Sequence, residues 1–242
     1  MNNKEQDSDK IRLNRFLAMC GISSRRKADN LIESGYISVN GKTIKLLGYQ
    51  VSISKDKVCF NGHEVSPEKK RYILLNKPKG YITTTSDERG RKHVMLLVNN
   101  ACKERIVPVG RLDKETTGLL LFTNDGLLAK KLTHPKYNVP KIYHVTLNKP
   151  LKNKYINQIK KGIKLEDGLV KIDSLDFLDK NKSKVKLKIH IGKNRIIRRI
   201  FKFINYNVIE LDRVSFSFLN KVGLKVGQWR SLKLIEVERL KE

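Results

Sequence analysis

The chain has 242 residues, enough for one large domain or for a small domain followed by a medium one. Hydrophobic residues make up 39% of it, which excludes a wholly disordered protein because that fraction can bury a core. Lys and Arg number 51 against 24 Asp and Glu, a formal net charge of +27, and such an excess favours a polyanionic partner over mere solubility.

The N-terminal stretch and the cysteines bear on the cellular compartment. The first ten residues are polar and lack the apolar stretch of a secretory signal, and no window approaches the ~20 apolar residues of a membrane span. The cysteines Cys20, Cys59 and Cys102 lack the paired spacing of a metal site or a disulfide framework. We therefore expect a cytoplasmic protein with no membrane partner and no metal.

The first predicted unit covers residues 11–66. An apolar stripe at helical spacing over residues 13–20 predicts one helix, and Ser23 or Ser24 suits the N-cap of a second. The Asn-Gly pairs at 40–41 and 61–62 each predict a β-hairpin. These elements make a small α+β domain, followed by a polar linker near residues 66–71.

The two predicted helices carry a group of basic residues, Arg12, Arg15, Arg25, Arg26 and Lys27. A solvated helix face is one explanation. Cations at a helix N-terminus oppose the helix dipole, so their presence there also favours a phosphate ligand. The stretch RLNRFLAMCGISSRRKADNLIESGYISVNGK resembles the RNA-binding module first known from ribosomal protein S-four. The resemblance implies a surface that docks structured RNA.

The second predicted unit covers residues 70–242. Apolar runs such as YILLNKP, GYITTT, LLLFTN, KIYHVTL and SKVKLKIHI predict strands, and the runs DGLLAKKLTH and NRIIRRIFKFIN predict two helices. We expect an α+β domain built on a mixed, mostly antiparallel sheet flanked by helices.

Asp113, in the stretch GRLDKETTGLLLFTNDG, has two readings. Local rules favour a helix N-cap or a turn, with Thr116 at the third position beyond it. The alternative is a catalytic carboxylate, which would need an arginine partner because a bidentate pair orients the carboxylate.

Three further segments also have a structural and a functional reading. Lys77 and Pro78 end an apolar strand and lead into a loop at Gly80. Tyr143 stands in an apolar strand with Lys141 on the same face, so it is either a core residue or a platform on which a base stacks. A predicted helix edge carries either solvated or phosphate-binding arginines, namely Arg195, Arg198 and Arg199.

Taken in chain order, these motifs resemble one family. KPxG, GRLDxxTxGLLLxTNDG, PKYxVxKxYxV, GKNRxxRR and GLKVGQWRSL are similar to those of the RsuA/RluB-type ribosomal RNA pseudouridine synthases, over about residues 11–235. The resemblance implies the pseudouridine synthase fold, no cofactor, and site-specific conversion of uridine to pseudouridine. Near-identical motifs serve both ribosomal RNAs, and GLKVGQWRSL with the compact linker favours large-subunit (23S) over small-subunit (16S) RNA. The expected substrate is a structured stem-loop with a flipped uridine, and we expect a monomer.

The resemblance also implies roles for individual residues. Asp113 would be the catalytic aspartate and Arg198 would pair with it. Tyr143 would stack on the target uracil and serve in proton chemistry at C5 or in shaping the pocket. Arg111 would enter the RNA and displace the base. The remaining expected RNA contacts are Lys77, Lys141, Arg195 and Arg199, the last two as phosphate ligands. His190 departs from the family pattern, in which many members carry an acidic or small polar residue before GKNR.

Two other functions compete with this one. A non-catalytic RNA-binding factor for ribosome assembly would need only the basic N-terminal module. A two-carboxylate glycosidase would need a second acid in a similar context, and none stands beside Asp113. Within the synthase hypothesis, the sequence leaves open whether the aspartate attacks the ribose or removes its C2′ proton.

Overall fold

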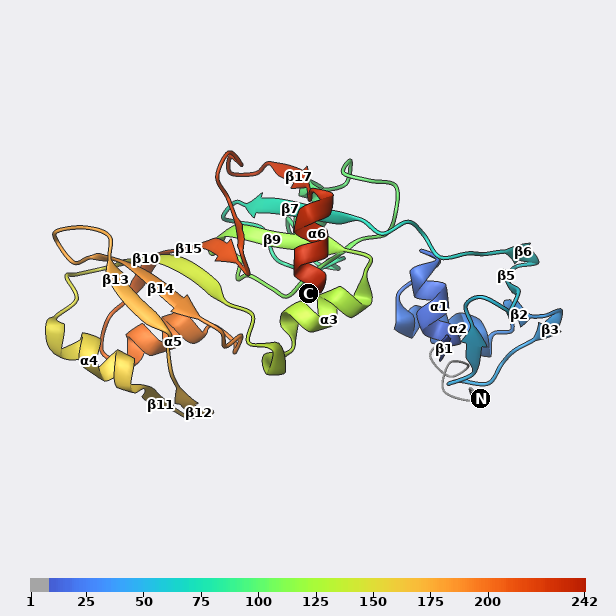
Figure 1. Ribbon diagram of the computed structural model, residues 1–242, viewed down its shortest axis with the longest axis horizontal. Helices are drawn as coiled ribbons and strands as arrows, with labels where there is room; N and C mark the ends of the chain where they lie inside the picture. Colours follow the sequence, from blue (N-terminus) through green and yellow to red (C-terminus); the bar gives the residue numbers. More distant parts are fainter. Residues whose placement is uncertain (1–8) are drawn as a thin grey trace. The chain divides into compact units, whose positions relative to one another are not determined.

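The computed structural model describes residues 9–242, and the chain divides into two compact units, Met1–Lys70 and Arg71–Glu242. Most of the polar stretch from which the lack of a secretory signal was inferred lies outside the described residues. No helix within residues 9–242 is both long enough and apolar enough to cross a membrane. Helices and a mixed sheet make the α+β architecture that the sequence predicts (Figure 1).

The first unit packs two helices against short strands. The helices are α1 (Leu13–Met19) and α2 (Arg25–Glu33). One small sheet has the order β3 (Lys42–Thr43), β2 (Ile37–Val39), β5 (Val58–Phe60), β6 (His63–Glu64), and a second pairs β1 (Lys10–Arg12) with β4 (Gln50–Ser52).

Local sequence signals account for the turns of this unit. The Ser24 side chain accepts a hydrogen bond from the Lys27 backbone N–H at 3.3 Å and so caps α2. Both predicted hairpins form, with each Asn at φ 50° and each Gly at φ 80°. Two successive positive φ angles are what a tight hairpin turn requires, and Asn-Gly pairs supply them at little cost.

The second unit is built on a nine-stranded sheet. Its main path runs β13 (Ser174–Phe177), β14 (Lys184–Ile189), β10 (Lys141–Leu147), β15 (Val208–Phe216), β9 (Thr117–Thr123), β7 (Tyr72–Lys77), β17 (Trp229–Ser231). Two short strands lie off this path: β8 (Val107–Pro108) pairs with β9, and β16 (Leu219–Asn220) pairs with β15. A separate hairpin joins β11 (Ile163–Leu165) to β12 (Gly168–Val170).

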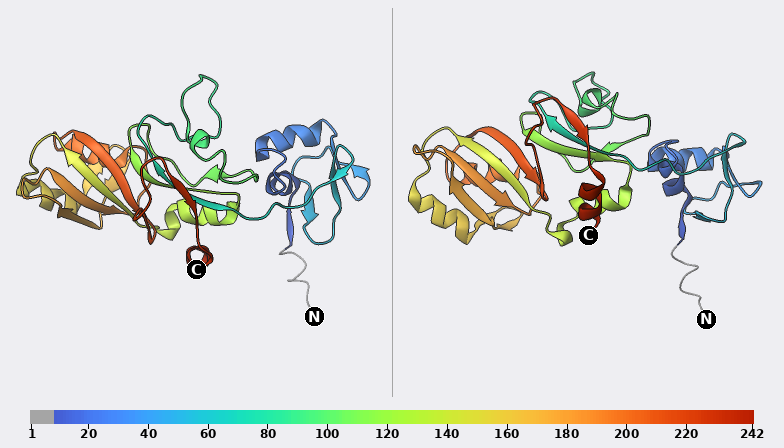
Figure 2. Two further views of the ribbon diagram at one scale, coloured as in Figure 1. Left: turned by 90° about the horizontal axis from the view of Figure 1, so that it is seen from above. Right: turned by 45° about the horizontal axis from the view of Figure 1, so that its top comes forward.

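Helices cover this sheet in two groups (Figures 1 and 2). The helices α4 (Asn153–Lys161) and α5 (Ile196–Phe203) pack their apolar side chains with those of β10, β13, β14 and β15. The helices α3 (Gly126–Thr133) and α6 (Leu234–Lys241) share a second core with β7 and β9. Two single-turn helices, Val94–Leu97 and Pro135–Tyr137, complete the unit.

The sequence prediction missed part of this architecture. Helices α4 and α6 were not predicted, because each buries only one or two side chains and so shows a short apolar stripe. The segment GYITTT was predicted as a strand, but Ile82 forms only an isolated bridge with His93. Apart from this bridge, residues 78–86 form a loop, which contacts the loop that carries Asp113.

A two-residue parallel pairing joins the two halves of the large sheet. Thr117 and Gly118 at the start of β9 pair with Asp212 and Arg213 of β15, and the other pairings in the described part of this sheet are antiparallel. Gly118 has φ +103°, and a Cβ added there would lie 2.3 Å from the Arg213 carbonyl oxygen. Only glycine fits such a close approach of two backbones. We call this contact the Gly118 junction.

Candidate active site

Asp113 lies in a loop that leads directly into the Gly118 junction. The backbone N–H of Thr116 donates to the Asp113 carbonyl at 3.0 Å, which makes a tight turn and no helix. The helix N-cap reading of Asp113 is therefore wrong. Its side chain is 35% exposed, so the carboxylate is open to a ligand.

The loop at residues 78–86 holds the Asp113 loop in place. The Thr83 hydroxyl donates to the Leu112 carbonyl at 2.8 Å and accepts from the Leu112 N–H at 3.2 Å. The Gly80 N–H donates to the Lys114 carbonyl at 3.0 Å. The loop that begins at the KPxG motif thus supports the Asp113 loop through both backbone and side-chain hydrogen bonds.

Lys77 is the strongest of these supports. It is 0% exposed, and its Nζ donates to the carbonyl oxygens of Thr116 (2.8 Å), Asp113 (3.2 Å), Lys114 (3.2 Å) and Pro78 (3.0 Å). Burial lowers the pKa of Lys77 to about 8. The expected contact of Lys77 with RNA does not agree with this placement, because its ammonium is enclosed by four carbonyl oxygens and Lys77 is not among the residues that line the cavity beside Asp113.

Arg198 approaches Asp113 from helix α5. Its Nε lies 4.0 Å from Asp113 Oδ2, an ion-pair distance without a short hydrogen bond. Its NH1 donates to the Val208 carbonyl at 2.9 Å, and its NH2 is buried without a partner. Burial lowers the pKa of Arg198, Arg195 adds to that effect, and Asp113 opposes it. The expected Arg198–Asp113 pair is present in a loose form.

Asp113 opens into a cavity of about 490 Å³ at the Gly118 junction. Tyr143 of β10 lines it, next to a bulge between Ile142 and Tyr143 in the pairing with β15. Such a bulge changes the direction of a side chain, as often happens beside active sites. Among the described residues, Asp113 is the only acid lining the cavity, and the bases are Arg111, Lys114, Lys141, Lys193, Arg195 and Arg213.

Lys141 sits partly buried at the cavity wall. Its Nζ donates to the carbonyl oxygens of Val139 (2.8 Å) and His190 (3.0 Å). Burial, with a smaller contribution from the Arg213 charge, lowers the pKa of Lys141 to about 8. The His190 ring lies 2.8 Å from an Asp173 carboxylate oxygen. The side chain of His190 therefore contacts Asp173, and its backbone carbonyl accepts the hydrogen bond from Lys141.

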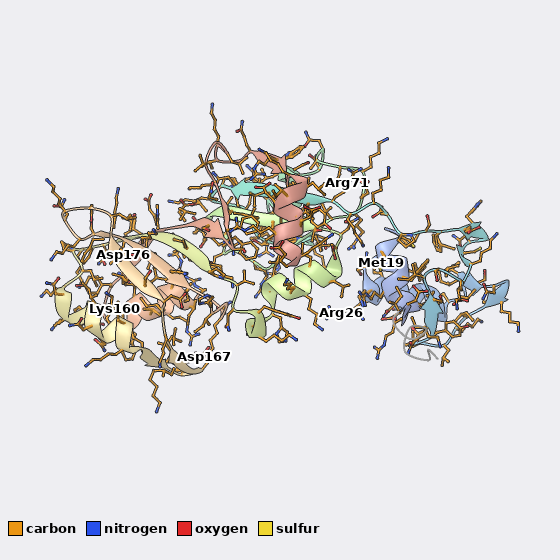
Figure 3. All side chains as sticks on the ribbon, viewed as in Figure 1. Met19, Arg26, Arg71, Lys160, Asp167 and Asp176 are labelled. Carbon is orange, nitrogen blue, oxygen red and sulfur yellow. The ribbon has the colours of Figure 1, made fainter. Side chains whose placement is uncertain are left out.

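The expected alignment of three arginines along one helix edge is wrong. Helix α5 begins at Ile196, and Arg195 precedes it in the left-handed region at φ 46°. Arg195 lines the cavity from this position, whereas Arg199 binds Asp167 through two hydrogen bonds of 2.9 and 2.7 Å. Asp167 lies between β11 and β12 (Figure 3), so the expected phosphate contact of Arg199 is replaced by an internal ion pair.

The other expected RNA contacts are accessible. Arg111 is exposed at the rim of the cavity. In the first unit, Arg12, Arg25, Arg26 and Lys27 are exposed and Arg15 is partly exposed. The first turn of α2, where Figure 3 labels Arg26, contains no acid that would neutralise these cations.

Sequence reasoning also missed two buried polar groups at the cavity. The Thr116 hydroxyl and the Arg213 NH2 are buried, have no hydrogen-bond partner, and belong to residues that line the cavity. A signal for Arg213 existed in the sequence. It lies two residues after Leu211 in an extended segment, at a position where a buried apolar residue is the rule.

Comparison with known proteins agrees with this geometry. The family model for RNA pseudouridylate synthase matches residues 71–203, and the S4 domain model matches residues 11–58. The chain belongs to the RNA pseudouridylate synthase family. The matched segment of this pseudouridylate synthase contains Asp113, Tyr143 and Arg198.

Individual relatives match over nearly the full length. The chain is 43% identical over 234 residues to ribosomal large subunit pseudouridine synthase B of Bacillus subtilis, covering 95% of each protein. It is 36% identical to an uncharacterized RNA pseudouridine synthase of Aquifex aeolicus, covering 95% of this chain and 93% of that one. A crystal structure of a pseudouridylate synthase aligns with a TM-score of 0.69 at 29% identity, over 95% of this chain and 99% of the other.

Proposed function

We propose that this protein converts a uridine of large-subunit ribosomal RNA to pseudouridine, with Asp113 as the catalytic aspartate. The observation that carries the proposal is the single carboxylate in a cavity whose other charged lining groups, among the described residues, are basic. Cations concentrate the polyanionic substrate at the cavity, and the carboxylate is the group placed to react with it.

The choice of RNA rests on a relative. The Bacillus subtilis protein that is 43% identical over 95% of this chain is named for the large ribosomal subunit. The first unit, with its S4 domain match and exposed cations at the start of α2, supplies a second basic surface for structured RNA. We infer that the protein works as a monomer in the cytoplasm, where this RNA is assembled.

The reaction requires the uridine to leave its stack. An enzyme that acts on a base in a helix flips the nucleotide at a cost of a few kcal/mol. Stacking on an aromatic ring returns about 1–3 kcal/mol per base. Tyr143 lines the cavity and can supply this platform, while exposed Arg111 at the rim is placed to fill the gap left in the RNA.

The chemistry exchanges a C–N bond for a C–C bond. The bond from uracil N1 to ribose C1′ breaks, the base turns within the cavity, and C5 bonds to C1′. C5 then loses its proton and N1 gains one, so the product is an isomer of the substrate. The Asp113 carboxylate either attacks C1′, forming an ester bond that breaks when C5 bonds to C1′, or removes the C2′ proton and returns it to C2′ after C5 has bonded to C1′. Both routes use its ionised form. Arg198, whose Nε lies 4.0 Å from Asp113 Oδ2, limits the directions in which the carboxylate can point.

The proposal is tested with Asp113→Asn, which keeps the shape of the side chain and removes its charge. Glu115→Gln is the matched control, because Glu115 is exposed two residues further along the same loop. Pseudouridines are mapped in both ribosomal RNAs from cells that carry each variant as their only copy. We expect one large-subunit pseudouridine to disappear with Asp113→Asn and to persist with Glu115→Gln.

Two results would contradict the proposal. If the modification persists at its normal level with Asp113→Asn, the catalytic assignment fails. If the pseudouridine that disappears lies in small-subunit RNA, the activity stands and the choice of RNA is wrong.

A further inference from the structure

Arg213 is a buried cation at the floor of the cavity. It is 3% exposed, lies on β15, and is the cross-strand partner of Tyr143 on β10. Its Nε donates to the Leu119 carbonyl at 2.8 Å, and its guanidinium carbon lies 4.9 Å from the centre of the Phe216 ring. Its NH2 is buried and has no hydrogen-bond partner.

The charge of Arg213 is not neutralised inside the protein. Within residues 9–242, no carboxylate lies within ion-pair distance of it, and the neighbouring Asp212 instead pairs with Lys221. Burying a charge costs several kcal/mol unless a partner compensates for it. A structural role in joining the sheet accounts for the hydrogen bond from Nε to the Leu119 carbonyl. It does not account for the buried NH2, which has no partner.

The position of Arg213 indicates which part of the substrate would compensate its charge. Exposed cations at the cavity, such as Arg111, suit the phosphates of the RNA backbone. Arg213 is deeper and sits beside Tyr143, the residue proposed to stack on the target base. Arg213 therefore lies at the level of the base.

We propose that Arg213 is a further catalytic residue, whose guanidinium donates a hydrogen bond to a carbonyl oxygen of the uracil as it detaches from the ribose. This inference rests on the proposed function. When the N1–C1′ bond breaks, its electron pair stays with the base and spreads from N1 onto the uracil oxygens. The guanidinium stabilises this negative charge and keeps its own protons, so no proton is gained or lost at Arg213.

A preorganised donor of this kind acts mainly in the transition state. Removing one such donor from an enzyme typically lowers the rate about 100- to 1000-fold. Binding of the RNA, which depends on contacts along the backbone, should change little. A purely structural role would instead lower stability and binding together and would not depend on the chemistry of the base.

The first experiment compares Arg213→Met with Arg239→Met. Arg239 is a matched control, because it also packs over an aromatic ring, Phe218 at 4.3 Å, but is exposed and does not line the cavity. Single-turnover loss of uridine is measured in a large-subunit RNA fragment, together with the Kd for the RNA. We expect a roughly 100-fold slower reaction with Arg213→Met at nearly unchanged Kd, and the wild-type rate with Arg239→Met.

The second experiment changes the leaving group. Fluorine at C5 makes uracil a better leaving group by stabilising its anion, so an RNA with 5-fluorouridine at the target needs less help from Arg213. We expect the rate defect of Arg213→Met in cleavage of the N1–C1′ bond to shrink by about tenfold or more with this RNA. Arg213→Lys, which keeps a cation, serves for the same comparison if Arg213→Met does not fold.

The outcomes separate the two proposals. An equal defect with uridine and 5-fluorouridine would overturn the role in charge stabilisation, as would a wild-type rate for the variant. A wild-type protein that converts no uridine would overturn the proposed function itself, whatever Arg213 does.

Discussion

Replacing Lys77 with methionine should slow catalysis in a protein that still folds. The substitution removes the donor that the carbonyl oxygens of Pro78, Asp113, Lys114 and Thr116 share. Buried carbonyls left without a donor cost about 1–3 kcal/mol each. Removing the buried ammonium also relieves a desolvation cost of several kcal/mol, so the two effects largely offset each other.

We therefore expect the free energy of unfolding to fall by about 2 kcal/mol with Lys77→Met. The Asp113 loop loses its central support, and a misplacement of about 1 Å at a reacting group can cost about 100-fold in rate. The assay is single-turnover formation of pseudouridine, read beside denaturant unfolding of the same protein.

Lys79→Met is the matched control for this change. Lys79 belongs to the same KPxG motif, but its side chain is exposed and reaches only Glu210 at 3.5 Å. We expect this control to keep both rate and stability. A folded Lys77→Met protein that forms pseudouridine at the wild-type rate would refute the reasoning, because the loop would then hold its geometry without the lysine.

Two further predictions concern the Gly118 junction and pH. Gly118→Ala places a methyl group 2.3 Å from the Arg213 carbonyl oxygen, so the free energy of unfolding, measured with denaturant, should fall by about 3 kcal/mol or more. Gly126→Ala, in open space at the start of α3, should raise it by up to about 1 kcal/mol. Equal effects of the two would show that the backbones at the junction can separate freely. Burial lowers the pKa of both Lys77 and Lys141 to about 8, so the rate of pseudouridine formation should fall as the pH rises through 8 and these cations are lost. The unfolded chain keeps these protons up to the ordinary value of 10.5, so over pH 8–10 the same lysines should make the free energy of unfolding rise. A rate and a stability that both fall between pH 8 and 10 would contradict this assignment.

Sequence patterns predicted the parts of the fold that depend on local rules. The Asn-Gly hairpins, the Ser24 cap and the buried face of α5 all follow from residues close together in the chain. Helices α4 and α6 were not predicted, because their stability comes from packing a few side chains onto strands that are distant in the sequence. No periodicity within such a short segment reveals that contact.

Site residues that belong to a family motif could be predicted from the sequence. Residues whose role depends on contacts between distant segments could not. Asp113, Tyr143 and Arg198 came from resemblance to a family, since local rules favoured a helix cap for Asp113. Lys77 looked like a surface lysine at the end of a strand, and only the folded loop shows that it is enclosed by carbonyl oxygens. Arg199 was similarly assigned to phosphate because its partner, Asp167, lies 32 residues away in the chain.

The Gly118 junction has a consequence for how tolerance to substitution should be interpreted in this protein. Asp113 and Gly118 stand five residues apart, one in the proposed chemistry and the other in the contact that joins the two halves of the sheet. A screen that scores growth would rank both positions as equally intolerant, although one loss is of reactivity and the other of assembly. Measuring the abundance of each variant beside its activity would separate them: Asp113 variants should accumulate as folded, inactive protein, and Gly118 variants should be degraded.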